Sequence, residues 1–274
     1  MTDLPAPAPL IICVATSGAL ASRAEHPALP YAPQEIADEI VRGAEAGAAM
    51  AHVHARTPDG KPTQDVEAFR EIVERVQARA DIILELSLGS RGFTVEESLA
   101  PLALRPAMAS FPMEIRNQAN GEASNLERGA RLLLERSARP SFAVTSLATR
   151  DVVLDVIGRG LGGDPPCLVV APQPGSGMAD AARSLLELTA PFQGLAHWWL
   201  MKGGPSGAAQ YALRAMAIAL GGHVRVGFED RLTRYEDASL APSNAWYVVE
   251  MQRLAGRMGR PVASAAEARR LLQL

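Results

Sequence analysis

The protein has 274 residues, of which 48% are hydrophobic and 21% charged, a balance that excludes disorder as its main state. The formal net charge is −3 and no basic stripe is present, which argues against nucleic acid and anionic membrane surfaces as partners. No apolar run is long enough to cross a bilayer, and the N-terminus lacks the positive region of a signal peptide. We therefore expect a cytoplasmic protein.

Short apolar runs alternate with longer amphipathic segments along the chain. The runs predict strands at 10–16, 50–55, 82–87, 108–111, 142–145, 167–171, 197–201 and 223–227. The amphipathic segments predict helices at 33–46, 64–78, 94–103, 126–136, 150–157, 178–189, 208–220, 245–258 and 265–272.

About eight strand–helix units in a chain of this length favour an α/β fold of the (β/α)8 TIM barrel type. No shift in composition marks a second domain, so we expect residues 1–274 to form a single (β/α)8 barrel domain with a short C-terminal helical extension. A doubly wound open sheet remains an alternative. It is weakened because residues 16–20, TSGAL, follow the first strand where that fold carries a G-x-G-x-x-G motif.

His52 and His54 are the first candidates for chemistry. They lie two positions apart on a predicted strand, so both side chains point to the same side, while Val53 between them suits the helix-facing layer. In a barrel, the pair would lie near the C-terminal rim, where active sites of this fold are built. Imidazole is the commonest metal-binding side chain, so the pair indicates a metal site. The alternative is two core histidines hydrogen-bonded to their neighbours.

A third ligand is expected from the end of the last strand. Counting by twos along residues 221–230, His223, Arg225 and Glu229 share one face, and Glu229 is nearest the catalytic rim. His223 would lie roughly 20 Å away along the strand, which makes it a poor ligand. His52, His54 and Glu229 are therefore the predicted ligands of a catalytic metal with open coordination positions. Zinc and ferrous iron both accept such a set.

Arg225 and Asp230 have two interpretations each. Arg225 either forms an internal salt bridge with Glu229 or stays free to bind a substrate carboxylate. Asp230 is either a solvated loop acid or a general base beside the metal. For Arg225 we favour binding of a substrate carboxylate, while both interpretations of Asp230 stay open at this point.

The ends of two other predicted strands add small and polar groups. Ser87 and Gly89 follow the third strand, where small residues let backbone N–H groups approach an anion closely. Ser110 ends the fourth strand. Ser and Gly are ordinary loop residues, so this signal is weak alone.

Two segments resemble the beta-keto acid cleavage enzyme family. They are residues 47–62, GAAMAHVHARTPDGKP, and residues 221–230, GGHVRVGFED, continued by LAPSNA at 240–245. The resemblance implies a (β/α)8 barrel, usually a homotetramer, with a divalent metal, normally zinc. It also implies a reaction in which a β-keto acid and acetyl-CoA give acetoacetate and a new acyl-CoA.

The same resemblance implies a role for each site residue. The family's metal ligands correspond to His52, His54 and Glu229, its substrate-binding arginine to Arg225 and its catalytic aspartate to Asp230. A serine matching Ser87 and a hydroxyl residue near Ser110 would help to hold the substrate carboxylate.

Two departures from the family pattern bear on the substrate. Members that act on amino substrates tend to carry an acid shortly after the first strand and often another in the fifth. Here residues 18–21 read GALA, with Leu20 among them, and the fifth strand contains Ala143 and no acid. We therefore expect a non-amino substrate with a neutral or apolar acyl chain. Another zinc- or iron-dependent lyase or hydrolase on the same barrel, or a catalytically degenerate metal-binding barrel, remain the alternatives.

Overall fold

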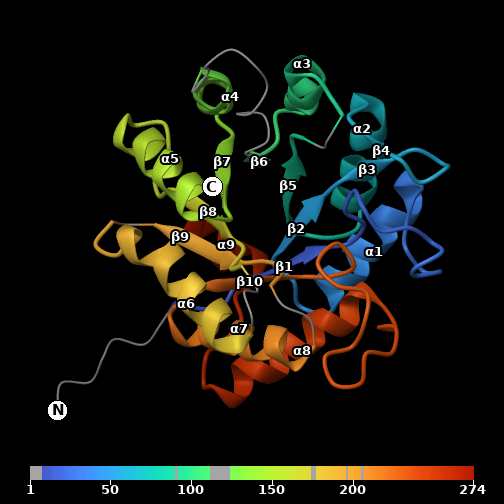
Figure 1. The fold of residues 1–274 in the computed structure, drawn as a ribbon. Helices are drawn as coiled ribbons and strands as arrows, with labels where there is room; N and C mark the ends of the chain where they lie inside the picture. The colour runs from blue at the N-terminus through green and yellow to red at the C-terminus, as the bar shows by residue number, and fades with distance from the viewer. Residues whose placement is uncertain (1–7, 90–91, 112–123, 174–176, 196, 205–206) are drawn as a thin grey trace.

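A computed structural model of the protein describes residues 8–89, 92–111, 124–173, 177–195, 197–204 and 207–274. Eight strands form a closed parallel barrel in the order β1-β10-β9-β8-β7-β6-β5-β2, with helices packed around the outside (Figure 1). The predicted TIM barrel is confirmed, and the open-sheet alternative is excluded because β1 pairs with both β2 and β10.

The barrel strands lie close to their predicted positions. They are β1 (Ile12–Ala15), β2 (Met50–Val53), β5 (Ile83–Ser87), β6 (Met108–Phe111), β7 (Arg139–Val144), β8 (Cys167–Val170), β9 (Trp198–Met201) and β10 (His223–Val226). A short antiparallel hairpin, β3 (Ala55–Arg56) with β4 (Pro62–Thr63), follows β2 and was not predicted.

The helices also follow the predicted pattern. They are α1 (Pro33–Glu45), α2 (Val66–Gln77), α3 (Val95–Leu99), α4 (Ser124–Glu135), α5 (Leu147–Gly158), α6 (Met178–Thr189), α7 (Ala208–Ala219), α8 (Asn244–Arg257) and α9 (Ala265–Leu272). The predicted helix at 94–103 is shorter than expected, because α3 gives way to a 3-10 turn over Ala100–Leu104 that contains Pro101, a residue without an N–H. No helix of the described chain is both long and apolar enough to cross a membrane.

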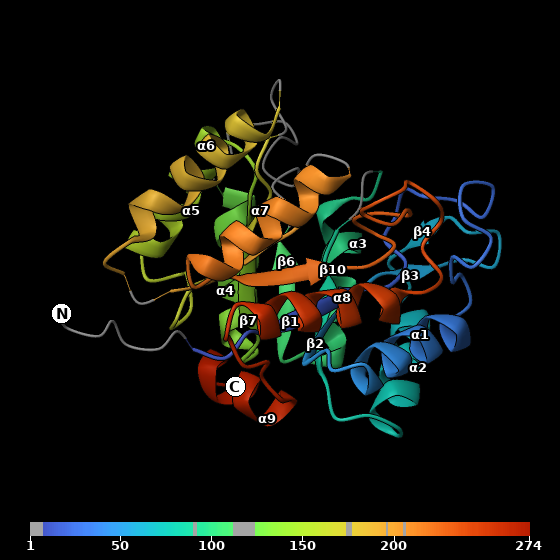
Figure 2. The ribbon, with the colours of Figure 1, turned by 90° about the horizontal axis from the view of Figure 1, so that it is seen from below.

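The side chains of each strand alternate between two buried layers. Along β2, Ala51 and Val53 pack in the layer beneath the helices, whereas Met50 belongs to the apolar cluster inside the barrel. Ala268 and Leu272 of α9 join that inner cluster, so α9 covers one end of the barrel (Figure 2). The opposite end receives the polar side chains, which places the candidate site at the rim where the strands finish.

Candidate metal centre and active site

The three predicted metal ligands come from segments far apart in the sequence. His52 lies within β2 and His54 immediately after it, while Glu229 follows β10. One strand, β1, separates β2 from β10 in the barrel, so all three side chains reach the same part of the rim. The alternation of β2 turns both imidazoles to the inner side and Val53 outward, as predicted.

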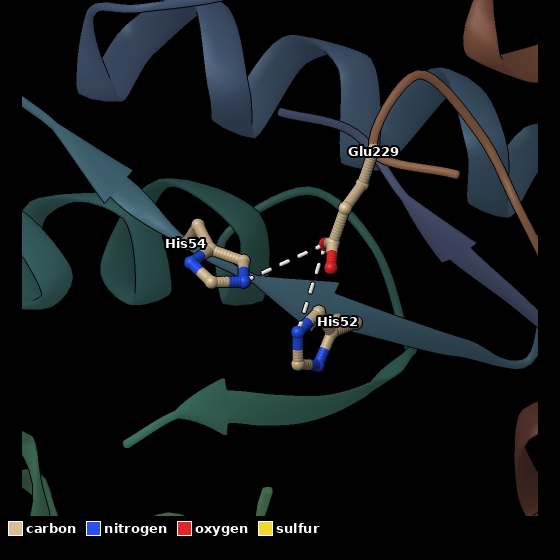
Figure 3. Close-up of side chains that lie close together, drawn as sticks. All are labelled: His52, His54 and Glu229. Carbon is tan, nitrogen blue, oxygen red and sulfur yellow. Dashed lines mark ion pairs between the residues drawn. The ribbon is translucent and has the colours of Figure 1, made fainter. Parts of the chain in front are cut away.

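The ligand atoms of these residues converge. Oε2 of Glu229 lies 3.6 Å from Nε2 of His52 and 3.6 Å from Nε2 of His54 (Figure 3). One ligand atom from each residue can be chosen so that all three lie within 4.8 Å of one another. Both histidines are buried. The predicted ligand triplet is therefore assembled, and His223 lies outside it: its Nδ1 accepts a hydrogen bond from the amide of Ile11 at 2.8 Å.

The charge states of the triplet suit a divalent cation. Burial lowers the pKa of His54, which keeps its imidazole neutral and able to offer a lone pair. Burial alone would raise the pKa of Glu229, but Arg225 and the two imidazoles together hold it well below its usual range. Metal ligands must be deprotonated, and this site provides neutral nitrogen and anionic oxygen donors.

Glu85 on β5 orients the first histidine and was not singled out by the sequence analysis. Its Oε2 lies 2.7 Å from Nδ1 of His52, and its other oxygen accepts a hydrogen bond from the hydroxyl of Ser141. Burial raises the pKa of Glu85, but the bond to His52, the bond from Ser141 and the charge of Arg225 together outweigh this and lower it, so the group is a carboxylate. A carboxylate only accepts, so Nδ1 of His52 carries the proton of this bond, and Nε2 is the nitrogen directed at Glu229.

One atom of the triplet indicates what the site can bind. Oε2 of Glu229 is buried and has no hydrogen-bond partner among the described residues. A buried carboxylate oxygen without a partner is costly, yet this one points between two imidazole nitrogens (Figure 3). Two nitrogen donors and one oxygen donor match the ligand set of catalytic zinc and of ferrous iron, so the residues present fit a divalent metal.

Arg225 and Asp230 form the second part of the site. Nε and Nη2 of Arg225 donate to the two carboxylate oxygens of Asp230 at 2.9 and 2.6 Å, and Nη2 also donates to Oε1 of Glu229 at 2.9 Å. The internal salt bridge, one of the two alternatives left open by the sequence, is thus present. Arg225 is not a free cation in this structure, and its role in binding substrate stays a prediction.

The three small residues predicted to bind substrate lie together on the neighbouring strands. Ser87 of β5 and Ser110 of β6 are partners in the strand register, and the hydroxyl of Ser87 donates to the backbone carbonyl of Gly89 at 3.3 Å. Because His52 pairs with Glu85 in the register of β2 and β5, Ser87 lies two positions closer to the open rim. Their contact with a substrate also stays a prediction.

The loop after β1 packs closely against Glu229. Gly18 adopts φ +59°, and a Cβ atom there would lie 2.6 Å from Cγ of Glu229, so any other residue would displace the ligand. The buried guanidinium of Arg56 donates to the carbonyls of Ser17, Gly18, Ala21 and Gly60, which fixes this loop.

Asn244, the first residue of α8, supports the ligand loop from the other side. Its Oδ1 accepts a hydrogen bond from the amide of Phe228 at 2.8 Å, and its Nδ2 donates to Glu39 at 2.7 Å. Asn244 therefore anchors the residue that precedes Glu229. In the sequence, Asn244 stands out only as part of a motif. An Asn next to the start of a helix does not indicate that it anchors a ligand loop.

Comparison with known proteins identifies the family. The profile of the beta-keto acid cleavage enzyme family matches residues 9–274. The chain belongs to this family. The resemblance seen in the two sequence motifs is thereby confirmed, and with it the assignment to enzymes that act on β-keto acids.

Two relatives show how the family varies. The 3-keto-5-aminohexanoate cleavage enzyme of Fusobacterium nucleatum is 34% identical over 275 residues, covering 97% of this chain and 98% of the relative. The 3-oxoadipate:acetyl-CoA acetyltransferase of Cupriavidus necator is 29% identical over 274 residues, covering 97% and 95%. One name describes a substrate with an amino group and the other a dicarboxylate, so family membership leaves the acyl chain open.

Solved structures agree with the fold. The binary complex of ObcA with oxaloacetate matches with a TM-score of 0.74 at 19% identity, covering 90% of this chain and 68% of that chain. At this identity the likeness extends to the barrel alone.

Proposed function

We propose that this protein is a metal-dependent enzyme that converts a β-keto acid and acetyl-CoA into acetoacetate and a new acyl-CoA. The observation that carries the proposal is the partnerless oxygen of Glu229, which faces His52 and His54 beside the Arg225–Asp230 pair. The relatives named as acetyl-CoA transferases of keto acids support acetyl-CoA as the second substrate.

The metal in this proposal is zinc, held by His52, His54 and Glu229. When bound, it supplies a Lewis acid to the ketone and carboxylate oxygens of the keto acid. Glu85 contributes by keeping the His52 proton on Nδ1. Ser87, Gly89 and Ser110 bind the carboxylate of the substrate from the β5–β6 side of the rim.

Asp230 is the base and Arg225 its positioning residue. A carboxylate oxygen of Asp230 takes a proton from C2 of the keto acid, and C2 forms a bond to the acetyl carbon as the CoA thiolate leaves. The thiolate then forms a bond to C3 while the C2–C3 bond breaks, and Asp230 returns the proton to C2. Atoms and charge balance across these steps. Arg225 holds both oxygens of Asp230, which keeps the base in one orientation throughout.

The substrate of this proposal carries no amino group. Leu20 in the loop after β1 is 83% exposed and offers no counter-charge, and Ala143 of β7 offers none either. An ammonium group beside either residue would therefore find no ion-pair partner in that side chain.

A panel of β-keto acids, each incubated with and without acetyl-CoA and analysed by mass spectrometry, tests the proposal. We expect acetoacetate and a new acyl-CoA only when both substrates and a divalent metal are present. Consumption of keto acid without acetyl-CoA would indicate a hydrolase or lyase. Failure to convert any keto acid in the metal-loaded protein would indicate a degenerate barrel.

We also propose an oligomeric state and a cellular compartment for this protein. One barrel domain over residues 1–274 forms a homotetramer in the cytoplasm. The family resemblance supports the tetramer, and the two free, buried cysteines, Cys13 and Cys167, are typical of a reducing compartment. Light scattering should give about 116 kDa, four times the 29.1 kDa chain, and a mass of one or two chains would contradict the tetramer.

A further inference from the structure

The chain uses lysine at only two positions, Lys61 and Lys202, although it has 27 lysines and arginines in total. Lys61 lies in the β3–β4 hairpin, is mostly exposed and pairs with Asp59 at 2.8 Å. Lys202 directly follows β9 and is partly buried. The sequence analysis did not single it out.

The strand register places Lys202 beside Arg225. Leu200 and Met201 of β9 pair with His223 and Val224 of β10, so the next pair toward the rim is Lys202 with Arg225. The ladder to β8 continues to this residue, since its amide donates to the carbonyl of Val170 at 2.9 Å.

The alternation of β9 decides where the side chain points. Leu200 belongs to the apolar cluster inside the barrel, whereas Met201 packs in the outer layer beneath the helices. Lys202 therefore returns to the inner side, above Leu200. The buried Gln210 of α7 donates to the carbonyl of Gly203 at 2.9 Å and holds the backbone just after the lysine.

The ammonium group of Lys202 faces charges that already have partners. Glu85 is bonded to His52 and Ser141, and Asp230 and Glu229 are bonded to Arg225. Within the described part of the chain, the ammonium has no hydrogen bond or ion pair. Burial lowers the pKa of Lys202 and Arg225 lowers it further, against the attraction of the three carboxylates. The ammonium is therefore an unpaired positive charge at the rim that an anionic group on a ligand can approach.

The position of Lys202 around the rim indicates which end of a substrate it meets. Ser87 lies on β5, which pairs with β2, and Ser110 lies on β6, the next strand around the barrel, whereas β9 pairs with β10 on the other side. A keto acid held at the metal triplet with its own carboxylate toward the serines would extend its acyl chain away from them. An acyl chain that crosses the mouth of the barrel in this direction would run toward β9, which Lys202 directly follows.

We propose that Lys202 is a specificity-determining residue whose ammonium binds a carboxylate at the distal end of the acyl chain, so that the preferred substrate is a β-keto dicarboxylate. The inference rests on the proposed function and replaces the neutral acyl chain expected from the sequence with an anionic one. It also gives a second reason against amino substrates, because their ammonium group would meet another cation.

The test compares two six-carbon keto acids that differ only at the distal end, 3-oxoadipate and 3-oxohexanoate, each with acetyl-CoA. We expect the wild-type protein to have the higher kcat/KM with 3-oxoadipate. In Lys202→Met, the ratio of the two kcat/KM values should fall at least about tenfold, because one partner of a desolvated charge pair is removed. Lys202→Arg should restore part of the ratio, and the matched control Lys61→Met should leave it unchanged.

Other kinetic results would overturn the inference. An equal loss of kcat/KM with both keto acids in Lys202→Met would indicate that the ammonium binds the carboxylate that both compounds share, or that it binds CoA. A wild-type preference for 3-oxohexanoate would remove the need for a distal cation. If the wild-type protein converts no keto acid at all, the proposed function fails, and the kinetic ratio has no meaning.

A binding measurement keeps the two failures distinguishable. Reductive methylation with a ¹³C label marks both lysines, and Lys202→Met identifies the signal of Lys202. We expect 3-oxoadipate, added to zinc-loaded protein without acetyl-CoA, to shift this signal, and 3-oxohexanoate to leave it in place. Equal shifts with both compounds, or none with either, would contradict the inference whether or not turnover is observed.

Discussion

Glu85 and His52 lie on neighbouring strands and are joined by a hydrogen bond of 2.7 Å from Nδ1 of His52 to Oε2 of Glu85. Both side chains are buried, so the bond fixes the tautomer and the ring orientation of the histidine. Glu85 therefore fixes the orientation of the candidate ligand His52, although Glu85 is not itself one of the three ligands.

Removal of the Glu85 charge should weaken metal binding. In Glu85→Gln, the amide no longer requires a proton on Nδ1 of His52, and we expect zinc affinity to fall by about 10–100-fold. Competition with a chelator of known affinity measures this. The control is Glu97→Gln on the surface of α3, and an affinity in Glu85→Gln equal to that control would show that the bond is only structural.

Replacement of the base should separate metal binding from turnover. Asp230→Asn keeps the shape of the side chain but removes the proton acceptor, and we expect kcat to fall by about 10²–10⁴-fold while zinc content is retained. Asp237→Asn, an exposed position in the same loop, is the control. If Asp230→Asn keeps wild-type turnover, another residue is the base.

Gly18→Ala should disturb the site through Glu229. The added methyl group has no room beside the Cβ and Cγ atoms of Glu229, so we expect a loss of zinc affinity of at least about tenfold. Gly92→Ala is a matched control, because Gly92 also has positive φ but open space around it. Equal zinc affinity in the two variants would mean that the loop after β1 does not hold the ligand in place.

Stability should fall in mild acid because of His223. Burial, with Arg260 nearby, holds its pKa well below the usual value, and its Nδ1 must stay unprotonated to accept from Ile11. The unfolded chain binds a proton on this residue below about pH 6.5, so the free energy of unfolding should drop by up to about 1.4 kcal/mol per pH unit below that point.

Urea unfolding of metal-free protein at pH 7.5 and pH 5.0 measures this effect. His223→Gln keeps an acceptor for Ile11 but does not titrate, so the variant should lose about 2 kcal/mol less than the wild-type protein between these pH values. His197→Gln, outside the barrel interior, is the control. The same loss in wild type and His223→Gln would contradict the assignment.

The sequence predicts the barrel well because periodicity carries the signal. A strand buried on both faces is a short apolar run, and each of the eight runs is a barrel strand. The β3–β4 hairpin was missed because it has only two residues in each strand, too few to show any alternation.

The sequence indicates the three candidate metal ligands more clearly than the residues that support them. The spacing of His52 and His54 indicates a metal site, and the position of Glu229 at the end of a strand indicates the third ligand. Glu85 carried a usable signal, since a carboxylate within the apolar run Ile83–Ser87 requires a buried partner. The role of Asn244 depends on where α8 meets Phe228 and Glu39, and that of Lys202 on the pairing of β9 with β10, and neither residue type indicates this in the sequence.

The zinc content of purified protein tests the central claim most directly. After reconstitution and dialysis, elemental analysis should find about one zinc per chain in the wild-type protein and in His223→Gln. It should find almost none in His52→Ala, His54→Ala and Glu229→Gln. Zinc that stays at the wild-type level in those three variants would contradict a metal centre built from these residues.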